Sequence, residues 1–98
     1  MEGLIANRLI NVSDQIEFMF KKYKIIGNVG YGGHIGNTVI ISPSGEENLS
    51  MTEHMFPSLT SWSEACLREG LHEEGMRYAS WKRVIHVPSQ RTLQSLRS

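Results

Sequence analysis

The groups in this chain that could do chemistry are a glycine-rich segment, four histidines, one cysteine and two pairs of adjacent glutamates. The glycines at positions 27, 30, 32, 33 and 36 would let backbone amides approach an anion closely. A dinucleotide-binding loop, however, needs a strand before its glycines and a helix after them, and a P-loop needs Gly-Lys-Ser/Thr. Here a β-branched run follows at residues 37–41 and no such lysine occurs, so the segment is predicted to form turns and strand ends.

The remaining groups match no enzyme motif. Serine, histidine and aspartate all occur, but a nucleophilic serine needs a positioned base and an oxyanion pocket, which spacing along the chain cannot show. Cys66 falls on the apolar side of a predicted helix and is expected to be a small buried hydrophobe. His34 and His86 could titrate near neutral pH, although single histidines more often pack or lie on the surface. The sequence therefore predicts a protein that is not an enzyme and that uses no metal, cofactor or small-molecule substrate.

Composition limits the chain to one ordinary globular domain. It has 98 residues, of which 40% are hydrophobic, and its ten Lys and Arg balance ten Asp and Glu. Zero net charge argues against strong electrostatic capture by nucleic acid or membrane. Apolar runs are far shorter than a membrane span, no secretory signal is recognisable, and the single cysteine cannot close an intrachain disulfide. We therefore expect an intracellular protein without a membrane partner.

Charge is distributed unevenly along this neutral chain. Residues 46–75 contain seven glutamates and one arginine, whereas residues 77–98 contain no acid and five basic residues: Arg77, Lys82, Arg83, Arg91 and Arg97. Lysines, arginines and hydroxyl groups supply most contacts to DNA phosphates. A solvated strand face followed by a basic tail is an equally good interpretation of the same pattern.

The elements that must position these groups follow from local patterns. Residues 14–23 are predicted to be a helix because Ile16, Met19, Phe20 and Tyr23 recur at helical spacing, with Gly27 as its stop. Residues 1–13 would be an N-terminal arm or a short helix. A β-hairpin is predicted around Gly45, with its strands at residues 37–41 and 48–52.

A second helix is predicted from Ser58 or Thr60 to Gly70, and a last strand at residues 78–87 before Pro88. The polar, basic tail at residues 89–98 is expected to be partly disordered. The fold class is therefore α+β, with a small antiparallel sheet whose central β-hairpin packs against two helices, and the main module spans residues 14–88.

Two segments carry a resemblance to a known family: FPSLTSWSEAC at residues 56–66 and ASWKRV at residues 79–84. They resemble the RAMA domain (restriction enzyme adenine methylase associated) in its eukaryotic variant, found in an MPN-domain-containing protein and in a meiotic ankyrin-repeat protein. The matching positions are Gly45 at the turn, Phe56, Ser58, Thr60 and Trp62 at the helix start, and Trp81 and Val84 on the closing strand. Leu59 and Ser80 stand where the family usually has proline and glycine.

The resemblance implies a module that binds double-stranded DNA, including methylated DNA, in a chromatin or genome-maintenance protein, which is nuclear in a eukaryote. Phe56, Trp62, Trp81 and Val84 have the character of core residues. Ser58 and Thr60, at a helix start, could grip a phosphate or equally cap their own helix. The proposed site is completed by three cations: Arg77, Lys82 and Arg83.

A second hypothesis is a protein-protein interaction module in chromatin or meiotic machinery. It would use exposed apolar side chains, for which Ile10, Met51 and Met55 are the candidates. A contiguous exposed apolar patch would favour this alternative over DNA binding.

Overall fold

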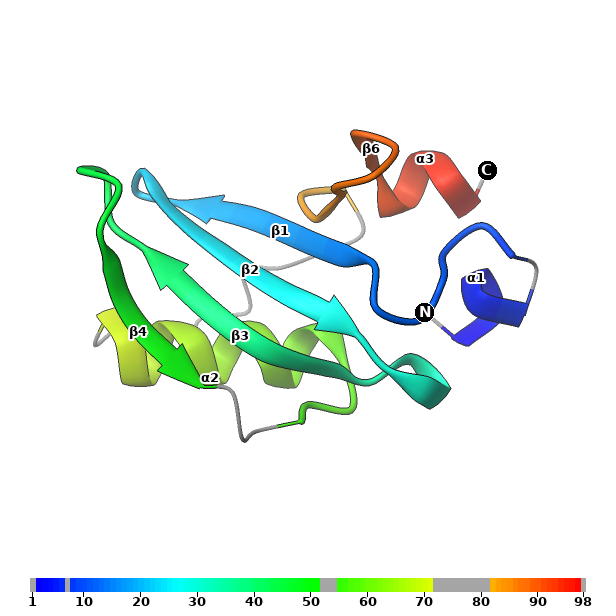
Figure 1. Cartoon of the computed structure of the whole chain (residues 1–98), viewed down its shortest axis with the longest axis horizontal. Helices are drawn as coiled ribbons and strands as arrows, with labels where there is room; N and C mark the ends of the chain where they lie inside the picture. The colour runs from blue at the N-terminus through cyan, green and yellow to red at the C-terminus, as the bar shows by residue number, and fades with distance from the viewer. Residues whose placement is uncertain (1, 7, 52–54, 72–81, 98) are drawn as a thin grey trace.

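The computed structural model describes residues 2–6, 8–51, 55–71 and 82–97. Its centre is a six-stranded antiparallel sheet in the order β4-β3-β2-β1-β5-β6 (Figure 1). The strands are β1 (Gln15–Phe20), β2 (Tyr23–Val29), β3 (Ile35–Ile41), β4 (Glu47–Met51), β5 (Ile85–His86) and β6 (Arg91–Thr92). The helical segments are α1 (Glu2–Ala6), the 3-10 turn η1 (Tyr31–Gly33), α2 (Leu59–Leu71) and α3 (Leu93–Arg97). The α+β class with an antiparallel sheet is confirmed.

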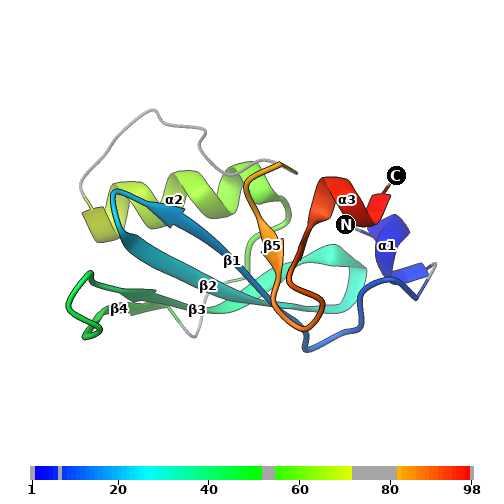
Figure 2. The same ribbon diagram turned by 90° about the horizontal axis from the view of Figure 1, so that it is seen from above.

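The sheet has one covered face and one open face. Helix α2 lies across one face, and the short helices α1 and α3 meet at one end of the sheet (Figures 1 and 2). Along β1, Ile16, Phe18 and Phe20 are buried whereas Gln15 and Met19 are exposed. Because alternate side chains of a strand point to opposite faces, this pattern sends the three apolar side chains toward α2. Among the described residues, no helix has the length and apolar character needed to cross a membrane.

Trp62 of α2 is the centre of the core. Its side chain is fully buried, and its Nε1–H donates a hydrogen bond of 3.0 Å to Oγ1 of Thr38 on β3. The ring of Phe18 meets the Trp62 ring edge to face at 5.1 Å between centroids. A Cβ at Gly27 would lie 2.6 Å from Cγ2 of Ile35 and 3.0 Å from Cζ2 of Trp62. The glycine in β2 therefore makes the room that the indole occupies.

Three of the four expected core residues lie in the described part of the structure, and all three are buried or partly buried. Trp62 and Val84 are fully buried, and Phe56 is partly buried against the core. Trp81 lies outside the described residues, so its expected role stays a prediction.

The predicted helix at residues 14–23 is wrong, because this segment forms β1 and the start of β2. A period of two, carried by Ile16, Phe18 and Phe20, competes there with the helical spacing, and pairing with β2 along all of β1 favours the strand. Lys21 and Lys22 form the turn between the strands, and both have positive φ angles, 47° and 70°. They are turn residues and do not belong to the last turn of a helix.

The expectation of partial disorder at residues 89–98 is also corrected. Strand β6 and helix α3 occupy most of this segment, and Leu93 and Leu96 are buried. These leucines are three residues apart and so share one face of α3, whose first turn is capped by the Ser95 N–H donating to Thr92 Oγ1 at 3.1 Å. Two leucines in a polar segment were too weak a pattern to predict this packing.

Other predictions are confirmed. The β-hairpin formed by β3 and β4 turns at Gly45, where φ is 92°. Helix α2 begins at Leu59, directly after Ser58, and ends at Leu71. Residues 1–13 contain the short helix α1, with Leu4 and Ile10 buried. The last strand, predicted at residues 78–87, is confirmed only in part: β5 covers Ile85–His86, Lys82 and Arg83 lie in a turn, and residues 78–81 lie outside the described ranges.

Candidate nucleic-acid interface

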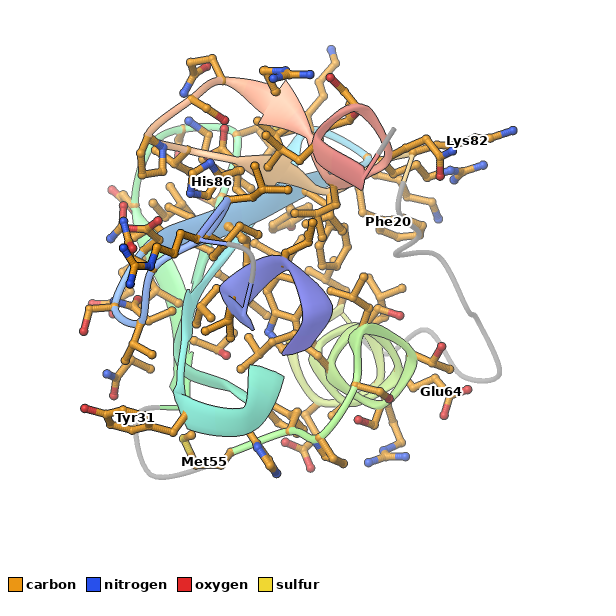
Figure 3. The ribbon with its side chains drawn as sticks, turned by 90° about the vertical axis from the view of Figure 1, so that its right-hand side faces the viewer. Phe20, Tyr31, Met55, Glu64, Lys82 and His86 are labelled. Carbon is orange, nitrogen blue, oxygen red and sulfur yellow. The ribbon has the colours of Figure 1, made fainter. Side chains whose placement is uncertain are left out.

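Residues 82–97, here termed the C-terminal unit, form a folded basic segment. It holds β5, β6 and α3, and its sequence contains no acidic residue. Lys82 and Arg83, at its start, are exposed, and Lys82 projects away from the molecule in Figure 3. Arg91 is turned along α3, because its Nε and Nη2 donate hydrogen bonds of 2.8 and 2.9 Å to Oγ and O of Ser95. Lys82, Arg83 and Arg91 thus extend from a folded segment.

The start of α2 is occupied by a cap. The Ser61 N–H donates to Ser58 Oγ at 3.1 Å, and the Ser58 N–H donates back to Ser61 Oγ at 3.2 Å. This reciprocal pair resembles a capping box in which a serine replaces the usual glutamate. Of the two readings that the sequence left open for Ser58, the structure shows the cap; Thr60 is exposed, and the first turn carries no acid.

The four predicted contact residues that the structure describes belong to two separate segments: Lys82 and Arg83 precede β5, and Ser58 and Thr60 lie at the start of α2. Lys82 projects at the upper right of the molecule in Figure 3, whereas α2 is seen end-on at the lower right. Arg77 falls outside the described residues. Lys82 and Arg83, which are adjacent in the turn before β5, are therefore the candidate contacts that the structure places together.

The C-terminal unit is attached to β1 by a short ladder and a few apolar side chains. Strand β5 pairs with β1 at Ile16 and Glu17, and the Val87 N–H donates to the Gln15 carbonyl at 2.9 Å. The Leu93 N–H closes the unit on itself through the Val84 carbonyl at 3.0 Å. Val84, Leu93 and Leu96 are buried in the core.

A second attachment is polar and centres on His86, which is buried. Its Nε2 lies 2.8 Å from Oδ2 of Asp14, and its Nδ1 lies 2.7 Å from Oγ of Ser89. Burial acts to raise the pKa of Asp14, but hydrogen bonds from the Asn11 N–H and from His86, together with the charge of the ring, hold this pKa below its usual value. An ionised carboxylate can only accept, so Nε2–H donates to Asp14 and, in the neutral ring, Nδ1 accepts from the Ser89 hydroxyl.

This group, here termed the polar link, has the residue types of a catalytic triad, but two described backbone amides in its turn are already paired. The Gln90 N–H donates to the His86 carbonyl at 2.8 Å, and the Arg91 N–H is directed at Ser89 Oγ at 3.4 Å. A serine nucleophile needs donors aimed at a developing oxyanion, and these two amides are already paired within the turn. The arrangement supports a structural connection between distant segments.

Sequence reasoning missed the polar link because 72 residues separate Asp14 from His86. Asp14 falls at the first residue of the segment 14–23, for which the sequence predicts a helix that does not form. The sequence shows only the local pair of His86 and Ser89, three residues apart, and such pairs are common in proteins.

Burial bears on Cys66, and geometry bears on metal binding. Cys66 is fully buried, as expected, and burial together with the charge of Glu69 raises the pKa of its thiol to about 12. Among the residues that the structure describes, no three His, Cys, Asp or Glu side chains gather where they could hold a metal ion.

An exposed apolar pair lies on the opposite side of the molecule from Lys82. Tyr31 and Met55 have 84% and 58% of their surface exposed and lie close together in Figure 3. Met55 is held there because the next residue, Phe56, exchanges two hydrogen bonds of 2.8 Å with Ile35. Of the other apolar candidates, Ile10 is fully buried, which excludes it from a contact surface, and the Met51 side chain is not among the described ones.

Comparisons of the chain with protein-family models, with curated proteins and with solved structures give no match.

Proposed function

We propose that this chain is a RAMA-like, non-catalytic module that binds double-stranded DNA through its C-terminal unit. The observation that carries the proposal is the exposure of Lys82 and Arg83 on a folded segment without acidic residues. Ordered cations hold phosphates better than a tail does, because less side-chain and backbone freedom is lost on binding. The motifs at residues 56–66 and 79–84 support the same assignment by resemblance.

The expected contact is local and sensitive to salt. Zero net charge removes long-range attraction by the whole molecule, so the affinity depends on the few phosphates that the C-terminal unit neutralises. On the basis of the resemblance, we also propose that the module prefers a methylated base and that it belongs to a nuclear, chromatin-associated protein. Ser58 has its hydroxyl in the helix cap, and we place it and Thr60 outside the main contact.

Fluorescence anisotropy with N6-methyladenine and unmodified duplexes tests the proposal. We expect binding at low salt and a loss of about tenfold or more in affinity for the variant K82E/R83E, since phosphate contacts supply most of the binding free energy. The matched control is K21E/K22E, which makes the same charge change in the turn between β1 and β2, at the far end of the sheet from α3 (Figure 1). Absence of binding by the wild type, or equal losses in both variants, contradicts DNA binding through this unit.

The exposed pair of Tyr31 and Met55 favours protein interaction as the second candidate function. Exposed aromatic and methionine side chains are typical anchors of protein interfaces. Site-specific photocrosslinking in cells tests it, with the crosslinker at position 31 and, as the control, at exposed position 44. One partner captured at position 31 alone supports this function, and identical products at both positions argue against it.

A further inference from the structure

Within the part of the chain that the structure describes, the C-terminal unit has few backbone connections to the rest of the fold. Strands β5 and β6 are two residues long each, and β5 meets β1 at only two register positions. Short ladders at a sheet edge open more readily than central ones, because few hydrogen bonds must break. Side-chain contacts therefore decide how firmly Lys82 and Arg83 are held.

The polar link is built to supply such a contact. Asp14 is itself fixed to β2, since its carbonyl accepts the Val29 N–H at 2.8 Å, and its Oδ2 also accepts the Asn11 N–H at 2.9 Å. From this anchor, hydrogen bonds run through the His86 ring to Ser89, in the turn between β5 and β6. The link thus joins the central strands β1 and β2 to the unit that carries Lys82 and Arg83.

All three side chains of the link keep partners in either protonation state of the ring. If Nδ1 also carries a proton, it donates to Ser89 Oγ, and the hydroxyl can turn to the His86 carbonyl at 3.4 Å. The described side chains contain no buried polar atom without a partner. Loss of one member would leave a buried ring nitrogen unpaired, which favours opening of the turn.

We propose that Asp14, His86 and Ser89 are positioning residues for the DNA contact: they hold the C-terminal unit on the sheet so that Lys82 and Arg83 stay in one fixed arrangement. Without the link, the unit opens locally while β1, β2 and β3 remain paired. DNA binding must then order the opened segment again, which costs conformational entropy. The affinity is therefore weaker, even when the link is broken by a substitution that changes no charge. The statement about affinity rests on the DNA binding proposed above, whereas the statement about local opening does not.

Hydrogen exchange of the variant S89A tests the local opening. The reporting amides are those of Val87, Gln90 and Leu93, which hold the unit together and to β1. We expect them to exchange about tenfold faster than in the wild type, with the amides of β2 and β3 unchanged. The matched control is S44A, which removes another hydroxyl pair, between Ser42 and Ser44 at 2.8 Å in the turn after β3. S89T, which restores a hydroxyl, should restore slow exchange.

DNA affinity is measured on the same proteins at a temperature where each is folded. Weaker binding by S89A, wild-type binding by S44A and recovery in S89T support positioning. If exchange in S89A rises equally at all amides, the substitution lowers global stability only, and the proposal is overturned. Unchanged DNA affinity in S89A also overturns it. If the wild type itself does not bind DNA, the proposed function fails, and the exchange data alone decide whether the link holds the unit.

Discussion

The buried hydrogen bond between Trp62 and Thr38 is the most informative residue-scale contact of the core. It joins α2 to β3 at 3.0 Å, and both side chains are fully buried. T38V keeps the side-chain shape but leaves the indole N–H without a partner, so we expect a loss of about 1–3 kcal/mol in the free energy of unfolding. Urea unfolding followed by tryptophan fluorescence measures this. Val39 on the same strand is only half-buried, and V39T is the control, expected to change stability by less than T38V.

Asp14 gives the fold a dependence on acid pH. Because its pKa in the folded protein lies below the ordinary value of 3.8, its ionised form stabilises the fold at pH values above 3.8. This contribution is lost as the pH falls through the folded pKa. We therefore expect the wild type to be more stable than D14N at pH 5, with the difference shrinking below about pH 4.

Thermal unfolding of both proteins at closely spaced pH values between 5 and 2.5 measures the difference. A difference that stays constant over this range would contradict ionisation of Asp14 as its source. Asparagine keeps the size of the side chain, so packing is nearly the same in the two proteins.

At the scale of elements, the turn between β1 and β2 is strained. Lys21 and Lys22 both have positive φ angles, the geometry of a type I′ turn, in which asparagine and glycine are favoured. The left-handed conformation costs an ordinary residue about 1 kcal/mol or more. We expect K21N/K22G to raise the free energy of unfolding by about 1 kcal/mol in chemical denaturation. An unchanged or lower stability would show that the lysine side chains compensate, for example through the ring of Phe20, which lies 5.4 Å from Lys21 Nζ.

Some elements of this fold can be predicted from sequence patterns and others cannot. The hairpin around Gly45 and helix α2 were predictable because turn chemistry, β-branched residues and an apolar helix face agree there. Residues 14–23 satisfied two periods at once, and only pairing with β2 and β5, which lies far along the chain, selects the strand. Local patterns contain no information about such pairing.

At the scale of the whole molecule, sequence identified charges but not their arrangement. The acid-free C-terminal stretch was visible, and Lys82 and Arg83 are exposed as a surface contact requires. The fold separates them from the start of α2 and leaves the apolar pair of Tyr31 and Met55 on the other side (Figure 3). The polar link that connects the unit to the sheet depends on two residues 72 positions apart, which only the fold brings together.

This arrangement predicts how salt affects DNA binding. If Lys82 and Arg83 each neutralise one phosphate, the logarithm of the binding constant falls with the logarithm of salt concentration by about 0.9 for each. K82Q/R83Q should therefore reduce the slope by about 2, whereas K21Q/K22Q, in the turn between β1 and β2, should leave it unchanged. Anisotropy titrations over a series of salt concentrations give both slopes. Equal reductions in the two variants would mean that the neutral molecule binds DNA through its charges in general, and that the folded C-terminal unit holds no defined phosphate contact.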